Sequence, residues 1–192
     1  VCDPSDERGW RLDGVLMQLN INTPRGKHSQ RHEQELISAL SVKWPNLSWV
    51  DTPKDMPAAV DGLWINKHGS VHAVVETKCR DLTEDLFLGR YDGEWLITAD
   101  KLKHGCTVAV LLGVPFYAYL ALVPDGVLYY RKISDSRGKR LANWREEKTT
   151  TPRNINGGSV ERVNAFLQMR DATRIQYRRS KVSDYYGQAV GA

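Results

Sequence analysis

The alternation of apolar and polar side chains predicts a β-hairpin at residues 60–78. Residues 60–65 and 71–76 are rich in β-branched and aromatic side chains, which favour strands. His68 and Gly69 lie between the two runs and supply a turn, because glycine tolerates the backbone angles that a tight hairpin loop requires. The chain is therefore expected to fold around this hairpin.

The register of this hairpin brings two acids together. With a two-residue loop, Ile65 lies opposite His72 and Asp61 lies opposite Glu76. Side chains alternate along a strand, so these residues and Lys78 share one face, with His72 lining it. Like charges directly opposite are destabilising, and a divalent cation between the carboxylates would turn this repulsion into coordination. The hairpin thus predicts a metal site.

A helix is predicted for residues 29–44, with Ser29 as its N-cap and Pro45 after its end. Its apolar side chains recur at helical spacing, at Leu36, Ile37, Leu40 and Trp44. Glu33 falls on the same stripe one turn earlier, whereas Glu35 projects to the opposite face. Two interpretations of Glu33 stay open: an acid directed at the sheet, or a first-turn acid favoured by the helix dipole.

Further apolar runs predict the remaining elements. They are a strand at residues 47–50, a helix capped by Thr83 at residues 83–88, a helix capped by Thr98 at residues 98–112, and strands at residues 116–123 and 127–133. The helix at residues 98–112 is expected to bury Leu102, Val108, Ala109 and Leu112. Strands that alternate with helices indicate the α/β class.

The hairpin motif resembles a known signature. Asp61, fourteen intervening residues and then Glu76-Thr77-Lys78 are similar to the motif of the PD-(D/E)XK nuclease superfamily, with Val60 in place of the proline. The resemblance covers a core of about residues 29–133. It implies a restriction-endonuclease-like αβββαβ core, in which a mixed central sheet is flanked by helices.

The resemblance also implies a metal-binding role for several residues. Asp61 and Glu76 would hold Mg²⁺ or Mn²⁺, aided by the backbone carbonyl of Thr77 and, through water, by Glu33. Carboxylate and carbonyl oxygens are the ligands that Mg²⁺ prefers.

Two lysines complete the implied catalytic site. Lys78 would orient or help to deprotonate the attacking water and stabilise the phosphate during the reaction. Lys101 resembles the polar residue that many members place on the helix after the Glu-x-Lys strand, facing the active site. An ordinary surface lysine is the alternative for Lys101.

Composition sets broad limits. A chain of 192 residues with 41% hydrophobic side chains suits one domain, here with a basic C-terminal extension at about residues 134–192. The net charge of +4 is compatible with a polyanionic partner without requiring one. The three cysteines form no CxxC pair, which favours a reduced cytoplasmic setting, and the resemblance implies a bacterial cell or a phage-infected host. Residues 106–123 lack charge, but Gly113 and Pro115 interrupt them, so no membrane span is expected.

The extension combines cations with aromatic side chains. They are Arg137, Lys139, Arg140, Arg145, Lys148, Arg153, Arg162, Arg170, Arg174, Arg178, Arg179 and Lys181, interleaved with Trp144, Tyr177, Tyr185 and Tyr186. Such a surface could follow a phosphate backbone and stack on bases, or it could be a solvated face.

These observations favour a divalent-metal-dependent nuclease that hydrolyses phosphodiester bonds in DNA. Two alternatives stay open: a non-catalytic nucleic-acid-binding module on the same fold, and a metal-free structural or interaction domain in which the motif is accidental. A homodimer that cuts both strands is also left open.

Overall fold

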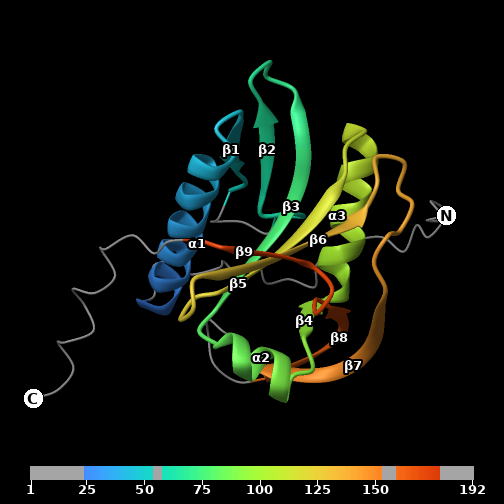
Figure 1. Ribbon diagram of the computed structural model, residues 1–192. Coiled ribbons are helices and arrows are strands. Elements are labelled where there is room, and N and C mark those ends of the chain that lie inside the picture. Colours follow the sequence, from blue (N-terminus) through green and yellow to red (C-terminus); the bar gives the residue numbers. More distant parts are fainter. Residues whose placement is uncertain (1–23, 54–57, 153–158, 178–192) are drawn as a thin grey trace, which may run out of the picture.

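The computed structural model describes residues 24–53, 58–152 and 159–177. Along the chain the elements are α1 (Pro24–Lys43), β1 (Leu47–Asp51), β2 (Gly62–Asn66), β3 (Val71–Arg80), α2 (Glu84–Arg90), β4 (Glu94–Thr98), α3 (Ala99–Leu112), β5 (Phe116–Leu122), β6 (Val127–Ser134), β7 (Trp144–Pro152), β8 (Ser159–Gln168) and β9 (Thr173–Gln176). Figure 1 shows α1 against one face of the main sheet and α3 against the other.

The main sheet is mixed, with strand order β1-β2-β3-β5-β6-β9. β3 and β5 are parallel and are joined through α3, while the other neighbouring pairs are antiparallel. A parallel pair needs such a crossover because a tight turn can join only antiparallel strands. A second, three-stranded sheet has the order β4-β8-β7. The expected α/β class with a mixed sheet is confirmed.

Side chains of alternating residues on β3 face two separate apolar cores. Val75 packs on the α1 side with Leu36 and Leu40, and Val74 packs on the α3 side with Leu102. The α3 side is tightly filled, since a Cβ atom added at Gly105 would lie 2.3 Å from the ring of Phe116. The central strand is thereby fixed from both faces, which positions the polar residues at its C-terminal end.

The predicted hairpin register is correct over part of its length. Leu63 pairs with Val74, and the register shifts after Trp64, so that Ile65 pairs with Val71 and not with His72. The expected pairing of Ile65 is therefore wrong.

The shift results from the turn. The side chain of Asn66 accepts hydrogen bonds from the backbone amides of His68 and Ser70, at 2.9 and 3.1 Å, and Gly69 has a φ of 80°. This geometry closes a longer loop than the predicted two residues and adds a bulge, as glycine at positive φ permits. His72 is the additional residue and is exposed, so it does not line the candidate site.

Helix boundaries differ from the expectation at several points. α1 begins at Pro24, five residues before the predicted cap Ser29, because proline is well tolerated in the first helical turn. Glu35 is half-buried, with one carboxylate oxygen buried, and so does not turn fully away from the sheet. Thr98 occupies the cap position of α3 without a side-chain capping bond, and Leu112 is exposed.

The short helix and the strands β5 and β6 follow the prediction closely. Thr83 caps α2, its hydroxyl accepting from the amide of Leu86, and the helix continues to Arg90. Residues 106–123 form the end of α3 and then β5, with a short connection. No helix in the described ranges is long and apolar enough to cross a membrane.

The predicted C-terminal extension contributes to both sheets. β9 pairs with β6 at the end of the main sheet, and β8 pairs with β4, which lies before α3 in the chain. β4 was not predicted from the sequence. Residues 134–177, where described, are thus built onto the rest of the fold through strand pairing.

Candidate functional site

The candidate site lies where β3 continues beyond its hairpin partner. Pairing between β2 and β3 ends at Gly62 and Val75, whereas pairing between β3 and β5 continues to Arg80. The predicted motif residues occupy this continuation of β3 and the segment that enters β2.

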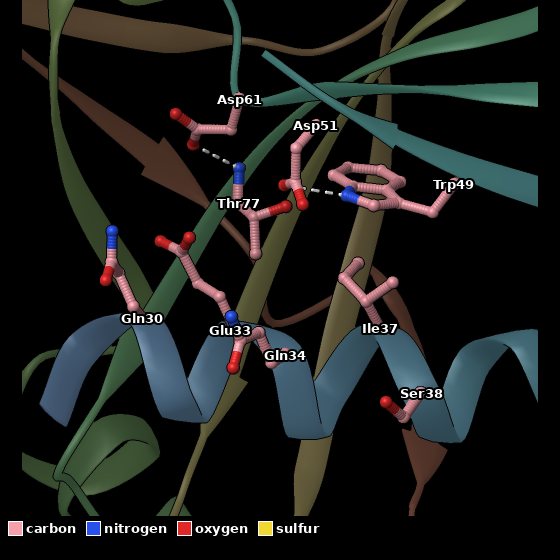
Figure 2. Close-up of a pocket in the computed structure, with 9 residues that line it drawn as sticks. All are labelled: Gln30, Glu33, Gln34, Ile37, Ser38, Trp49, Asp51, Asp61 and Thr77. Carbon is pink, nitrogen blue, oxygen red and sulfur yellow. Dashed lines mark hydrogen bonds between the residues drawn. The ribbon is translucent and has the colours of Figure 1, made fainter. Parts of the chain in front are cut away.

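Asp61 is held beside β3 by its main chain and its carboxylate. Its backbone amide donates to the carbonyl of Val75 at 3.1 Å, and its Oδ2 accepts from the backbone amide of Thr77 at 2.8 Å (Figure 2). The hydroxyl of Thr52 donates to the Asp61 carbonyl at 3.0 Å. The carboxylate therefore has a fixed position beside the C-terminal half of β3, and its Oδ2 already accepts a hydrogen bond.

Lys101 joins the two predicted acids. It lies in the first turn of α3, and its Nζ is 3.2 Å from Oε2 of Glu76 and 3.4 Å from Oδ1 of Asp61. It also donates to the carbonyl of Ala58 at 3.2 Å. The predicted neighbours Asp61 and Glu76 are thus brought to one point, and Lys101 faces them as the resemblance suggested.

Burial sets the protonation of this cluster. Desolvation of the Glu76 side chain, followed by the charge of Asp61, raises the pKa of Glu76 from 4.5 to about 8. Lys101 is also partly desolvated, but the two carboxylates outweigh that effect and raise its pKa above the ordinary value. Near neutral pH the metal-free site therefore holds a proton on Glu76 and a charged ammonium on Lys101.

Lys78 follows Glu76 on the same face of β3. Burial, followed by the charge of Arg80, lowers the pKa of Lys78, while nearby carboxylates including Asp61 oppose the shift. A lysine with a lowered pKa gives up its proton more readily than an exposed one, which is a property of lysines that act in proton transfer.

Glu33 approaches from the opposite side of the sheet. Figure 2 shows its carboxylate directed from α1 toward Thr77 and Asp61. These residues, with Asp51, line a cavity of about 220 Å³ between α1 and the strands. Of the two interpretations left open for Glu33, this geometry favours the acid directed at the sheet. Asp61 lines this cavity on the α1 side of the sheet and also contacts Lys101, which belongs to α3 on the other side.

Two features of this cavity were not predicted. Asp51, at the end of β1, accepts a hydrogen bond from the indole of Trp49 at 2.9 Å and brings a third carboxylate to the cavity. Its register opposite Gly62 could have been found by pairing the predicted strand at residues 47–50 with the hairpin. Thr77 is 3% exposed, and its hydroxyl has no partner within the described part of the chain.

These oxygen ligands suit Mg²⁺ better than a metal ion whose ligands must all come from protein side chains. Within residues 24–53, 58–152 and 159–177, no three His, Cys, Asp or Glu side chains form a metal-binding group. Mg²⁺ is commonly held by one or two carboxylates, with water and substrate phosphate completing its ligands. Asp61 and Glu76 provide that pair, and the pKa of Glu76, raised first by burial and then by the charge of Asp61, shows that a second negative charge is unfavourable at this position.

Much of the positive charge after residue 134 is paired with acids. Arg145 contacts Glu94 at 2.8 Å, and Arg174 contacts Glu84 at 2.6 Å. Further pairs are Arg170 with Asp92 and Lys148 with Glu161. These contacts reduce the basic character suggested by the residue count.

The predicted aromatic side chains of this region differ in how far they are accessible to a nucleic acid. The guanidinium of Arg140 stacks 3.3 Å from the ring centroid of Trp144, whereas Tyr177 is buried and cannot stack on a base. Outside the described residues lie Arg153, Arg178, Arg179, Lys181, Tyr185 and Tyr186.

Comparisons with protein-family models, with curated proteins and with solved structures find no match to this chain. The functional argument therefore depends on the chemistry of the site.

Proposed function

We propose that the protein is a divalent-metal-dependent nuclease that hydrolyses phosphodiester bonds, with DNA as its substrate. The observation that carries the proposal is the convergence of two acids, Asp61 and Glu76, on one ammonium group at the end of a strand that also bears Lys78. Glu76, Lys78 and Lys101 all have shifted pKa values, and such shifts cluster at functional sites more than on neutral scaffolds.

The order of elements supports the proposal. α1, β1, β2, β3, α3 and β5 follow one another in an αβββαβ order, apart from the insertion of α2 and β4. The parallel pairing of β3 with β5 across α3 agrees with the mixed sheet of a restriction-endonuclease-like core. The site lies at the C-terminal end of the central strand, on the portion that extends past β2.

Asp61 and Glu76 are the residues that would hold Mg²⁺ or Mn²⁺. The amide of Thr77 points toward Asp61, and in an extended strand the carbonyl of the same residue points to the same side, which places a further oxygen ligand at this edge. When bound, the metal supplies a Lewis acid for the phosphate and lowers the pKa of a water molecule. Glu33 adds negative charge on the α1 side of Asp61.

The lysines have different tasks in this proposal. Lys101 holds the two carboxylates in place through contacts of 3.2 and 3.4 Å and limits their repulsion. Lys78 has a lowered pKa and lies two residues beyond Glu76, so it is suited to exchange a proton with water and to interact with phosphate oxygen.

One observation favours a second candidate, a nucleic-acid-binding module without catalysis. Lys101 contacts both Asp61 and Glu76, and near neutral pH its charge balances that of Asp61 while Glu76 holds a proton, so the cluster needs no metal for charge balance. In that case Mg²⁺ would neither stabilise the protein nor be required for binding. The two candidates therefore differ in a measurable metal dependence.

The test is incubation of the purified protein with linear, circular single-stranded and branched DNA in Mg²⁺, Mn²⁺ or EDTA. We expect metal-dependent cleavage that is lost in Lys78→Ala. Lys103→Ala is the matched control, because Lys103 is an exposed lysine that pairs with Glu146 on the surface. DNA binding without cleavage of any substrate, and without a metal-induced thermal shift, would replace the nuclease with the binding module.

A further inference from the structure

A second cavity, of about 320 Å³, lies on the α3 side of the main sheet beside α2 and β4. Its lining is mainly apolar and aromatic and includes Arg80, Phe87, Tyr91, Glu94, Trp95 and Leu120. The volume is within the usual range for small-molecule sites, about 300 to 1,000 Å³. The cavity is separate from the acidic cavity that Glu33 and Asp51 line.

This cavity is adjacent to the candidate catalytic lysine. Leu120, which lines it, is the register partner of Lys78 in the parallel pair β3·β5. Arg80, also in the lining, is two residues beyond Lys78 and faces the same side of β3, at a rise of about 6.6 Å along the strand. A cation at Lys78 and a cation at Arg80 therefore follow one another at a spacing comparable to that of consecutive phosphates.

One residue of the lining carries a buried polar group that has no partner in the described part of the fold. Trp95 is 3% exposed and lines the cavity, and its indole Nε1 has no hydrogen-bond acceptor within the described ranges. Buried N–H groups are nearly always paired, because leaving one without a partner costs free energy. An acceptor supplied by a ligand would account for this donor.

The remaining walls suit a flat aromatic ligand. Phe87 is buried against the core, whereas Tyr91, at the end of α2, lines the cavity and is exposed, with the guanidinium of Arg90 5.9 Å from its ring centroid. The charge of Glu94 is engaged by Arg145 at 2.8 Å, so it repels the phosphates of a nucleic acid less than a free carboxylate would. Bases stack on aromatic side chains irrespective of sequence, since every base has a π face.

We propose that this cavity is a subsite for one nucleobase of the substrate, next to the phosphate that Lys78 faces. The base stacks on Tyr91 and accepts a hydrogen bond from Trp95, and Arg80 contacts the adjoining phosphate. This inference rests on the proposed function, because it assigns part of the same substrate to a neighbouring cavity.

The test measures binding of a fluorescein-labelled single-stranded oligonucleotide by anisotropy, in Ca²⁺ and in EDTA, with the full chain. A set of oligonucleotides carrying one abasic nucleotide at successive positions identifies any base that contributes to binding. We expect one position at which the abasic nucleotide weakens binding about tenfold, as loss of one stacked base would. Tyr91→Ala should cause the same loss and should make binding insensitive to the abasic position.

Two further variants separate ligand contact from packing. Trp95→Phe removes the unpaired N–H and keeps an aromatic ring. Because Trp95 is buried in the core, the smaller ring lowers thermal stability, but oligonucleotide affinity should also fall severalfold at a temperature where a thermal melt shows the variant to be folded. Leu86→Ala is the matched control, since Leu86 is exposed on the same helix but does not line the cavity.

The outcomes distinguish the subsite from the proposed function. Metal-dependent cleavage by the wild type, with a flat abasic series and unchanged binding by Tyr91→Ala, would overturn the subsite and leave the nuclease intact. A wild-type protein that neither binds nor cuts DNA would overturn both.

Discussion

Replacing Glu76 by glutamine should remove a pH dependence from the stability of the metal-free protein. The pKa of Glu76 is raised to about 8 in the folded state, first by burial and then by Asp61, from 4.5 in the unfolded chain. The folded protein therefore binds more protons than the unfolded protein between pH about 4.5 and 8, and the free energy of unfolding falls as the pH rises through this range. Glutamine resembles the protonated carboxyl and does not titrate.

The magnitude follows from the shift. Each pKa unit corresponds to about 1.4 kcal/mol, so the full shift of Glu76 is equivalent to roughly 5 kcal/mol. Relaxation around a buried charge and entry of water reduce such penalties. We therefore expect wild type to lose about 2 to 4 kcal/mol more than Glu76→Gln between pH 5 and pH 9.

The assay is urea unfolding in EDTA at several pH values from 5 to 9, for wild type, Glu76→Gln and a control. Glu147→Gln is the control, because its carboxylate is half-exposed and pairs with a surface arginine, Arg145. Only Glu76→Gln should flatten the pH dependence. Parallel curves for wild type and Glu76→Gln would refute the account of a buried, destabilised carboxylate.

Three further predictions concern the cation, the metal and the packing that positions β3. Lys101→Met removes the ammonium between two acids, so the free energy of unfolding in EDTA near pH 8 should fall by about 1 to 3 kcal/mol, measured by urea denaturation. An unchanged denaturation midpoint would contradict the contact of Lys101 with both acids. Mg²⁺ should raise the melting temperature of wild type more at pH 8.5 than at pH 6, because at pH 6 its binding must displace a proton from Glu76. Equal increases of the melting temperature at the two pH values would contradict this. Gly105→Ala should destabilise the protein by about 1 to 3 kcal/mol, because the added methyl group would clash with the ring of Phe116. Gly89→Ala, in open space on α2, should be neutral or stabilising by up to about 1 kcal/mol. Similar urea denaturation curves for the two variants would contradict the packing argument.

Sequence patterns predict the local part of the fold well. The alternation of apolar and polar residues in the hairpin predicts the correct pairs nearest the site, Leu63 with Val74 and Gly62 with Val75. A shift of the register by one residue would turn the apolar side chains to solvent. The same pattern cannot show that the Asn66 side chain binds the turn amides and adds a bulge, which removes His72 from the predicted face. Side-chain bonds in turns compete with the simple alternation.

Elements that depend on distant partners are harder to predict. β4 is a short segment whose antiparallel partner, β8, lies more than sixty residues away. Its aromatic and β-branched residues after Asp92-Gly93 are typical of a strand, but a segment of five residues before a helix does not by itself reveal the strand with which it pairs. Helical spacing places Glu33 toward the sheet, but it cannot determine that Lys101 lies between Asp61 and Glu76. That contact depends on the crossover through α3, which is a property of the assembled fold.

The most direct test of the proposed function is the initial rate of DNA cleavage by wild type and Glu76→Gln at pH 8, with Mg²⁺ or with EDTA. The account predicts cleavage by wild type only with Mg²⁺, and no cleavage by a folded Glu76→Gln variant that is at least as stable as wild type. Cleavage by Glu76→Gln at the wild-type rate, or no cleavage by wild type with Mg²⁺ or Mn²⁺, would contradict it.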